Sequence, residues 1–227
     1  YVEGYQAGGS VTSCTFADNG SYPVQVKATL LEMLGSGNSF TGNAIQRVGV
    51  SCSLTDDITD TDAWPSLPIP IELGAGGGDQ VLTIASGGQL TIAAGNTIYA
   101  TQVDCRGKLE LAGTAAEPCL IGAAPGSTTG GAWEGLLLYP GSVGSFSHIF
   151  LACAGTGLTA DGATLSLQSS TIESCEYDGV RVTGASAVTI ADTIFRGNGR
   201  CGLRLEGSGM TGTVQGCQFL TNGSYPL

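Results

Sequence analysis

Few side chains in this sequence could do acid–base or nucleophilic chemistry. The chain has a single histidine, His148, in the run Ser147-His148-Ile149-Phe150. Catalysis by a Ser-His-Asp or Cys-His set would rest on this residue, and no nucleophile-elbow motif accompanies it. Because a histidine beside an inward-facing aromatic residue is ordinary in a strand, we assign His148 no catalytic role.

Carboxylates are the second group of candidates. Enzymes that cleave glycosidic bonds use a pair of carboxyl groups that flank the scissile bond. Acidic residues of the last third of the chain do not share one position of the sequence repeat described below; they are Asp161, Glu173, Glu176, Asp178 and Asp192. We therefore predict that the protein is not an enzyme, and we keep a polysaccharide lyase or hydrolase as the alternative.

An acidic loop offers the one candidate metal site. Asp56, Asp57, Asp60 and Asp62 fall within seven residues. Ca²⁺ takes about six to eight oxygen ligands, so carboxylates of this kind could hold it. The loop lacks the spacing and the glycine of an EF-hand, so we favour a solvated loop over a calcium site. No other metal, and no organic cofactor, is predicted.

The cysteines indicate an oxidising compartment. There are eight: Cys14, Cys52, Cys105, Cys119, Cys153, Cys175, Cys201 and Cys217. Their number is even, no two form a C-x-x-C pair, and one histidine is too few for ordinary Cys/His zinc sites. We therefore expect disulfide bonds and a secreted or cell-surface protein, with buried free thiols as the alternative.

Composition favours an all-β fold. The chain has 37 glycines, 42% hydrophobic residues and only 12% charged residues. No long stretch has the i, i+3, i+4 spacing of an amphipathic helix. The hydrophobic content is too high for a disordered chain, so strands should form a buried core.

Net charge excludes several partners. The formal charge is −11, from 8 basic and 19 acidic residues. Nucleic acids are bound by clustered Lys and Arg, so no nucleic-acid partner is expected, and anionic membrane surfaces are disfavoured too. No apolar run approaches the roughly 20 residues of a membrane span. No leader of charged and then apolar residues follows Tyr1, so we expect any signal peptide to be removed or to lie outside this sequence.

A repeat of 22 to 24 residues organises the last third of the chain. Gly157-Leu158, Gly179-Val180 and Gly202-Leu203 are spaced by 22 and 23 residues, and Leu227 follows 24 residues after Leu203. Eight positions before these four apolar residues stand Phe150, Ile172, Phe195 and Phe219. Five positions before them stand Cys153, Cys175, Asn198 and Asn222.

Three columns that repeat together predict a solenoid. Each coil would hold short strands joined by corners, with equivalent residues stacked about 4.8 Å apart. The apolar columns would fill the interior, and the Asn-Gly pairs would form a corner with left-handed backbone angles. Asn19, Asn198 and Asn222 should then hydrogen-bond along a corner ladder. Asn-Gly is also a hairpin motif, but here it recurs once per coil. We therefore predict a right-handed parallel β-helix.

A longer repeat is superimposed on the first. Residues 1–24 match 204–227 without gaps at a spacing of 203 residues, and Asn19-Gly20-Ser21-Tyr22-Pro23 recurs as Asn222-Gly223-Ser224-Tyr225-Pro226. Two interpretations remain open: an excerpt from a tandem array, or two equivalent ends that stack on one another. Both describe a long, quasi-one-dimensional object.

The repeats divide the chain into three parts of one continuous solenoid. Residues 1–50 should form coils like the C-terminal one. Residues 51–70, which are acidic and contain Pro65, Pro68 and Pro70, should form a loop or an extension. Residues 71–227 should form the main β-helix.

Several of these motifs resemble a known family. The sequence is similar to bacterial surface and secreted proteins with right-handed parallel β-helix repeats, of the pectin-lyase-like superfold; the matching motifs are Leu82-Thr83-Ile84, Gly107-Lys108-Leu109, Ala112-Gly113-Thr114 and Trp133-Glu134-Gly135. The resemblance implies an exported, modular protein and says little about function, because one fold hosts many functions. Cys119 departs from it by replacing an aliphatic residue, which suggests a local disulfide bond to Cys105.

The columns suggest further pairs. Cys153 and Cys175 share a column, so their Cα atoms should lie within disulfide range. Cys201 and Cys217 flank the next corner, which leaves Cys14 with Cys52. Two pairs of charged residues should also stack on neighbouring coils, and these are Glu173 with Arg196 and Arg181 with Arg204.

We predict from these features a structural or adhesive extracellular protein. It would be a β-solenoid module of a surface fibre, filament or adhesin, with copies of itself as partners, stacked end to end or in tandem. The alternative is a β-helix that binds or cleaves polysaccharide, for which Arg181 and Arg204 could contact an anionic glycan. A third hypothesis, an interaction module of a larger receptor-like protein, makes the same predictions as the first.

Overall fold

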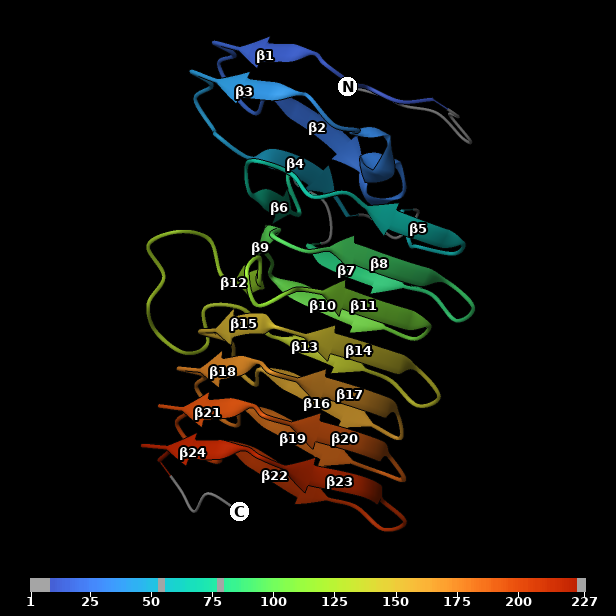
Figure 1. Ribbon diagram of the computed structural model, residues 1–227, viewed down its shortest axis with the longest axis vertical. Helices are drawn as coiled ribbons and strands as arrows, with labels where there is room; N and C mark the ends of the chain where they lie inside the picture. Colours follow the sequence, from blue (N-terminus) through green and yellow to red (C-terminus); the bar gives the residue numbers. More distant parts are fainter. Residues whose placement is uncertain (1–8, 53–55, 77–79, 224–227) are drawn as a thin grey trace.

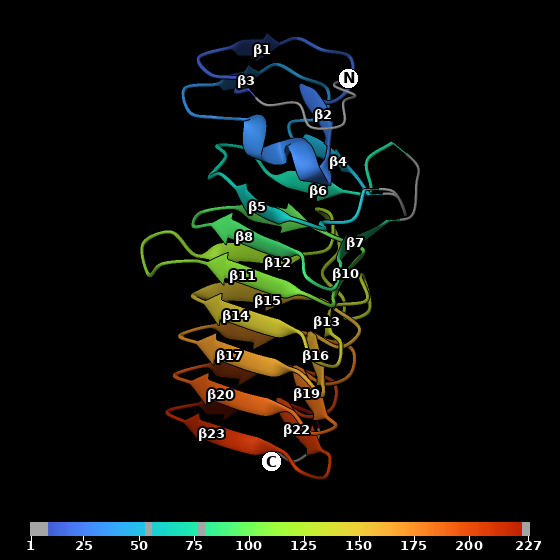
Figure 2. The same ribbon diagram turned by 90° about the vertical axis from the view of Figure 1, so that its right-hand side faces the viewer.

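The protein is an all-β, right-handed parallel β-helix. The computed structural model describes residues 9–52, 56–76 and 80–223. Successive coils stack along one axis, with the N-terminal coils at one end and the C-terminal coils at the other (Figures 1 and 2). Among the described residues the only helical segment is one 3₁₀ helix, η1 (Ala28–Met33). None of the helical structure described is long and apolar enough to cross a membrane.

Each regular coil contributes one strand to each of three parallel sheets, which we name I, II and III in the order in which the chain visits them. Sheet I contains β7 (Val81–Ile84), β10 (Gln102–Cys105), β13 (Leu136–Leu138), β16 (Leu158–Asp161), β19 (Val180–Thr183) and β22 (Leu203–Glu206). Sheet II contains β5 (Thr61–Trp64), β8 (Gln89–Ala93), β11 (Lys108–Ala112), β14 (Val143–Ser147), β17 (Thr164–Gln168), β20 (Ala187–Ala191) and β23 (Thr211–Gln215).

Sheet III is the longest and extends furthest toward the N-terminus. It contains β2 (Val24–Lys27), β4 (Val48–Ser51), β6 (Ile71–Leu73), β9 (Thr97–Tyr99), β12 (Cys119–Gly122), β15 (Ile149–Ala152), β18 (Thr171–Glu173), β21 (Ile194–Arg196) and β24 (Gln218–Leu220). The remaining strands, β1 (Thr15–Ala17) and β3 (Ser39–Thr41), form a separate two-stranded parallel sheet.

One apolar column runs the whole length of sheet III. The strand registers stack Val24, Val48, Ile71, Ile98, Ile121, Leu151, Ile172, Phe195 and Phe219. Its seven inner members are at most 4% exposed. Alternate residues of a strand point to opposite faces, so one inward position per strand is enough to build a continuous core.

The register corrects one member of the predicted column. Leu151, rather than Phe150, pairs with Ile172, and Phe150 lies beside Thr171 on the half-buried outer side. The cause is a corner that is one residue shorter. Seven positions separate Leu151 from Leu158, whereas eight separate Ile172 from Val180. The predictions for Ile172, Phe195 and Phe219 are confirmed.

The asparagine corner forms as predicted on two separate pairs of coils. The side-chain oxygen of Asn198 accepts the N–H of Cys175 at 3.1 Å, and Nδ2 of Asn198 donates to Oδ1 of Asn222 at 2.9 Å. Asn19 makes the corresponding bond with Asn43, at 2.7 Å. The ladder therefore links Asn198 to Asn222 and Asn19 to Asn43.

Left-handed backbone angles at this corner lie one residue earlier than predicted. Gly197 has φ +62° and Thr221 has φ +51°, whereas neither Asn198 nor Gly199 has positive φ. Gly199 is required for a different reason. A Cβ atom there would lie 2.1 Å from the carbonyl oxygen of Glu176 on the neighbouring coil.

Residues 51–70 contribute to the stack through β5, whose inward positions are Asp62 and Trp64. Trp64 pairs with Ile92 and donates its indole N–H to the carbonyl oxygen of Ala28. Asp62 pairs with Leu90 and is 7% exposed, so a carboxyl group occupies a position that is apolar in the next coil. Burial, followed by the nearby charges of Glu32 and Asp60, raises the pKa of Asp62 to about 6.

This burial predicts an inverted pH dependence at Asp62. A raised pKa means that the folded state binds the proton more tightly than the unfolded state. Stability should therefore be lost as pH rises from about 4 to about 6, and the loss should persist above that range. Asp62→Asn should raise the free energy of unfolding at pH 8 by about 2 kcal/mol and change it little at pH 3.5, measured by urea denaturation. Glu110→Gln, at an exposed position on β11 that does not contribute to the pKa of Asp62, is the control. Equal effects of Asp62→Asn at both pH values would contradict the assignment.

The buried asparagine gives a second prediction. Asn198→Ala removes the acceptor of the Cys175 N–H and the donor to Asn222 in a corner that excludes water. An unsatisfied buried polar group costs about 1–3 kcal/mol, and we expect the free energy of unfolding to fall by that amount. Asn222→Ala, in the half-exposed last coil, should cost less than half as much because water can replace the lost bonds. Equal losses of unfolding free energy in the two variants would show that water reaches the corner around Asn198.

Candidate assembly interface

The last described coil leaves one edge of every sheet open. β22, β23 and β24 are the final strands of sheets I, II and III, and no described strand pairs with their outer edges (Figure 1). An unpaired strand edge presents free N–H and C=O groups to whatever lies beside it. Over residues 9–52, 56–76 and 80–223, these three edges therefore have no strand beside them.

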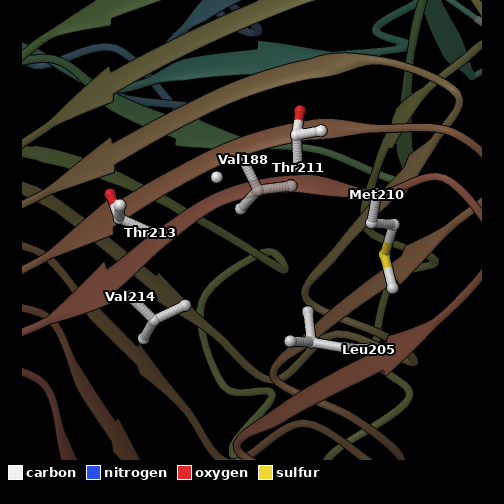
Figure 3. Close-up of a pocket in the computed structure, with 7 residues that line it drawn as sticks. Val188, Leu205, Met210, Thr211, Thr213 and Val214 are labelled. Carbon is white, nitrogen blue, oxygen red and sulfur yellow. The ribbon is translucent and has the colours of Figure 1, made fainter.

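Interior side chains become exposed at the same end. Leu205 stacks on Val182 and Val214 stacks on Ile190, both of which are fully buried. Leu205 itself is 46% exposed and Val214 is 38% exposed. Figure 3 shows them with Met210 around one hollow, which is lined by Val188, Leu205, Met210, Thr211, Gly212, Thr213 and Val214. Sequence reasoning missed this patch, because both residues occupy core positions of the repeat.

Aromatic stacking is nearly identical at the two ends of the molecule. Phe195 and Phe219 stack with ring centroids 5.1 Å apart and an interplanar angle of 9°. Phe16 and Phe40 stack at 5.3 Å and 8°. Phe16 and Phe219 are equivalent residues of the duplicated segment, and each is half-buried, with a described ring on one side only.

Asparagine bonds repeat at both ends with the same polarity. Asn198 donates its backbone N–H to Oδ1 of Asn222, and Asn19 donates to Oδ1 of Asn43, each at 3.1 Å. The later coil always supplies the acceptor. Over the part of the chain that is described, the Asn222 backbone N–H and the Asn19 side-chain oxygen have no hydrogen-bond partner. One end thus carries a donor and the other carries its acceptor.

The outer face of sheet I holds the predicted arginine stack. Arg181 lies beside Arg204 on neighbouring strands, as expected. Both contact Glu206, which accepts from Nε of Arg181 at 3.0 Å. The two arginines hold the pKa of the Glu206 carboxyl below its usual value. Sequence reasoning missed Glu206, although its place two residues after Arg204 puts it on the same face of β22.

The predicted ion pair between neighbouring strands of sheet III is formed by Glu173 and Arg196. The other candidate acids lie on different faces. Asp161, on sheet I, accepts a hydrogen bond from Thr183, and Asp178 is buried in the corner beside Cys201. Asp161 and Asp178 are therefore held by different partners.

His148 is a corner residue. It lies between β14 and β15 with φ +46°, and its Nδ1 is buried without a hydrogen-bond partner. The surrounding corner is held by backbone hydrogen bonds, such as the one that the Cys119 N–H donates to the His148 carbonyl oxygen. His148 is therefore a turn residue of the corner that joins β14 to β15.

The acidic loop does not converge on one point. Asp56 forms an ion pair with Lys27 at 2.9 Å, while Asp62 points into the core. Asp57 is half-buried and Asp60 is exposed. Over residues 9–52, 56–76 and 80–223, no group of three or more His, Cys, Asp or Glu side chains could hold a metal ion.

None of the expected disulfide bonds is present, and all eight cysteines, each of them in a described segment, are free thiols. Cys153 is offset by one residue from Cys175. It precedes the corner with φ +61°, and Ala154 takes the position that stacks on Cys175. The same short corner that displaced Phe150 causes this offset.

The other expected pairs are separated by the fold. Cys105 lies on β10 of sheet I and Cys119 on β12 of sheet III. Cys201 precedes sheet I, whereas Cys217 precedes sheet III. Cys14 is exposed in the first described coil, and Cys52 is buried at the end of β4.

Burial makes several of these thiols unreactive. It raises the pKa of Cys52 and Cys105 to about 11 and that of Cys175 to about 12. The thiolate is the reactive form, so these three residues act as small apolar core residues at neutral pH.

Comparison with known proteins agrees with the geometry. Residues 130–227 match the family model of the right handed beta helix region. No curated protein and no solved structure matches the chain. The family includes both enzymes and non-enzymes, so the match does not assign a reaction. The three stacked parallel sheets and the family match over the C-terminal coils therefore agree on one fold, the right-handed parallel β-helix.

Proposed function

We propose that the protein is a structural β-solenoid module that stacks end to end in an extracellular fibre or filament. The observation that carries the proposal is the duplicated coil, which makes the same aromatic and asparagine contacts at both ends of the molecule. The same contacts would join tandem copies within one longer chain.

The two ends are complementary rather than identical. The C-terminal coil offers a backbone N–H at Asn222, and the N-terminal coil offers the side-chain oxygen of Asn19. Such a head-to-tail contact is heterologous, and a heterologous contact whose rotation does not close a ring generates an open filament. The polarity of the bonds therefore favours a fibre over a symmetric dimer.

Burial of the open end supplies the driving force. A coil added there would pair the edges of β22, β23 and β24 and cover Leu205 and Val214. Removal of apolar surface from water stabilises the contact by about 25 cal/mol per Å². Strand pairing adds direction and register to this non-directional attraction.

An extracellular surface is the setting we propose for the fibre. The charge of −11 and the glycine-rich, weakly charged composition suit an exported protein, as does the resemblance to bacterial surface and secreted β-helix proteins. An adhesive role would use the outer faces of the three sheets, since the coil ends are occupied in a fibre.

Carbohydrate binding is the second candidate, favoured by a hollow on the outer face of sheet I. It is lined by Leu137, Leu138, Tyr139, Thr159, Asp161, Arg181 and Thr183. An aromatic ring beside polar groups suits a sugar, but Glu206 already neutralises Arg181. Saturable binding of one member of a panel of acidic polysaccharides, or release of reducing ends from it, would favour this function.

End-to-end assembly predicts different effects for two leucines of the last coil. Leu205 and Leu220 are 46% and 45% exposed, but only Leu205 faces the open end, because Leu220 stacks beside Arg196 on the outer side. The wild-type protein should form filaments at high concentration, seen by negative-stain electron microscopy and light scattering. Leu205→Asp should abolish them by placing a charge in the joint, and Leu220→Asp should retain them.

Circular dichroism and urea denaturation should show both variants folded. A wild-type protein that stays monomeric at its solubility limit, or equal loss of filaments in both variants, would contradict the proposed function.

A further inference from the structure

We propose that two copies of the chain pack side by side through the outer face of sheet III, with their solenoid axes antiparallel and with Glu173 of each copy bound to Arg196 of the other. This contact lies on the flank of the solenoid and does not depend on end-to-end assembly. It gives this flank a partner, a second copy of the same chain, and it sets the register in which the two copies meet.

The outer face of sheet III carries two columns of side chains. They lie on either side of the inward core column, on strands that follow one another along the solenoid axis (Figure 1). The strand registers give the first outer column as Leu120, Phe150, Thr171, Ile194 and Gln218. They give the second outer column as Ala152, Glu173, Arg196 and Leu220.

Apolar side chains on this face are open to solvent. Leu120 is 38% exposed and Leu220 is 45% exposed. Phe150 and Ile194 are half-buried at outward positions of the same sheet. On sheet II, by contrast, the outward side chains of β17 and β20 are small or polar. An exposed apolar patch beside polar groups is typical of a protein–protein contact, so the outer face of sheet III is the flank suited to one.

An ion pair divides the apolar side chains of this face. Glu173 and Arg196 lie side by side in the second outer column and bind one another within one copy. The Arg196 side chain is nevertheless 52% exposed. A guanidinium has five N–H donors, and Nε is the one that donates to Glu173. Arg196 can therefore bind a second carboxylate that approaches from outside.

Two-fold symmetry makes the face complementary to itself. When two sheets pack face to face about an axis parallel to their strands, each column faces the same column of the other copy, in reversed strand order. With this axis between β18 and β21, Glu173 of each copy faces Arg196 of the other. Four charges of alternating sign then lie together, which favours association.

Other face-to-face arrangements are opposed by the same charges. An axis through β18 brings the two copies of Glu173 opposite each other, and an axis through β21 does the same for Arg196. An axis along the solenoid places the first column against the second, so that Arg196 faces Ile194. Like charges directly opposite one another, and a charge covered by an apolar side chain, both disfavour association. The charges thus select the axis between β18 and β21.

Side-chain sizes fit the selected arrangement. Ala152 of β15 faces Leu220 of β24 in the other copy, so a small side chain meets a large exposed one. In the first outer column Phe150 faces Gln218 and lies diagonally beside the same Leu220. Packing of these apolar groups removes them from water on both sides of the axis.

Four strands from each copy make this a small contact. Interfaces of stable complexes bury about 800 Å² on each partner, and four short strands offer less. We therefore expect a weak dimer that exchanges rapidly with the monomer. Where copies are also stacked end to end, the face recurs along the flank, and several weak contacts act together.

Charge reversal tests the contact and its register. Every protein in the test carries Leu205→Asp, which blocks the end-to-end joint, so that association reports the flank alone. Glu173→Arg and Arg196→Glu should each raise the dimer Kd by about tenfold or more, because each places like charges across the axis. An equimolar mixture of the two variants should dimerise as tightly as the parent, because one variant is positive at both positions and the other is negative at both.

Sedimentation equilibrium at several protein concentrations measures these Kd values, and circular dichroism should show every variant folded. Neither variant keeps the ion pair within its own copy, so recovery on mixing reports contact between copies. Arg181→Glu reverses a charge on the outer face of sheet I and is the matched control, which should leave the Kd unchanged.

Cross-linking locates the face independently. Residues 152 and 220 of one copy are three strands apart, which is about 14 Å at the strand spacing and too far for a disulfide bond. A chain that carries both Ala152→Cys and Leu220→Cys should therefore form this bond only between copies, as mapped by mass spectrometry after mild oxidation. Absence of the bond would overturn the register.

Two results of the charge-reversal experiment would overturn the proposal. Single variants that dimerise as tightly as the parent, or a mixture that stays monomeric, would rule out the pairing of Glu173 with Arg196. A parent that is monomeric at every concentration would rule out a second copy as the partner of this face. Neither result bears on end-to-end assembly, because Leu205→Asp removes that joint from every sample.

Discussion

Parallel pairing between coils is the constraint on which the rest of the structure depends. A strand of three to five residues cannot satisfy its own backbone groups, so each coil needs a neighbour on both sides. In-register pairing stacks equivalent residues of successive coils on one another. It aligns the sheet III column from Val24 to Phe219 and places Asn198 next to Asn222. The last described coil lacks such a neighbour on one side among the described residues. Its backbone groups are unpaired there, and its core side chains Leu205 and Val214 are exposed on the same side.

Much of this arrangement could be predicted, because stacked positions repeat in the sequence. Ile172, Phe195 and Phe219 were found from their spacing, as were the Glu173–Arg196 pair and the corner asparagines. Sequence spacing no longer predicts the stacking partner where a corner changes length by one residue. Residues after the short corner keep their sequence spacing but change their stacking partner, and this moved Phe150 and Cys153 out of their predicted columns. The predicted disulfide bond between Cys153 and Cys175 assumed that all corners have the same length, and both residues are free thiols in the structure.

Two buried polar residues, Asn198 and Asp62, differ in how well the neighbouring coils accommodate their polar groups. Asn198 has partners on both neighbouring coils, so its amide serves as an extension of the backbone ladder. Asp62 stands where the next coil has Leu90, and its ionisation is opposed by burial and by Glu32 and Asp60. The first residue could be predicted, since it recurs. The second could not, because an aspartate among other aspartates and prolines in residues 51–70 resembles a solvated loop.

Exposed core positions carry the strongest argument about assembly. Here the last described coil exposes Leu205 and Val214 and repeats the aromatic and asparagine contacts of the first coil. A surface that is both apolar and patterned for strand pairing has the properties of a joint between coils.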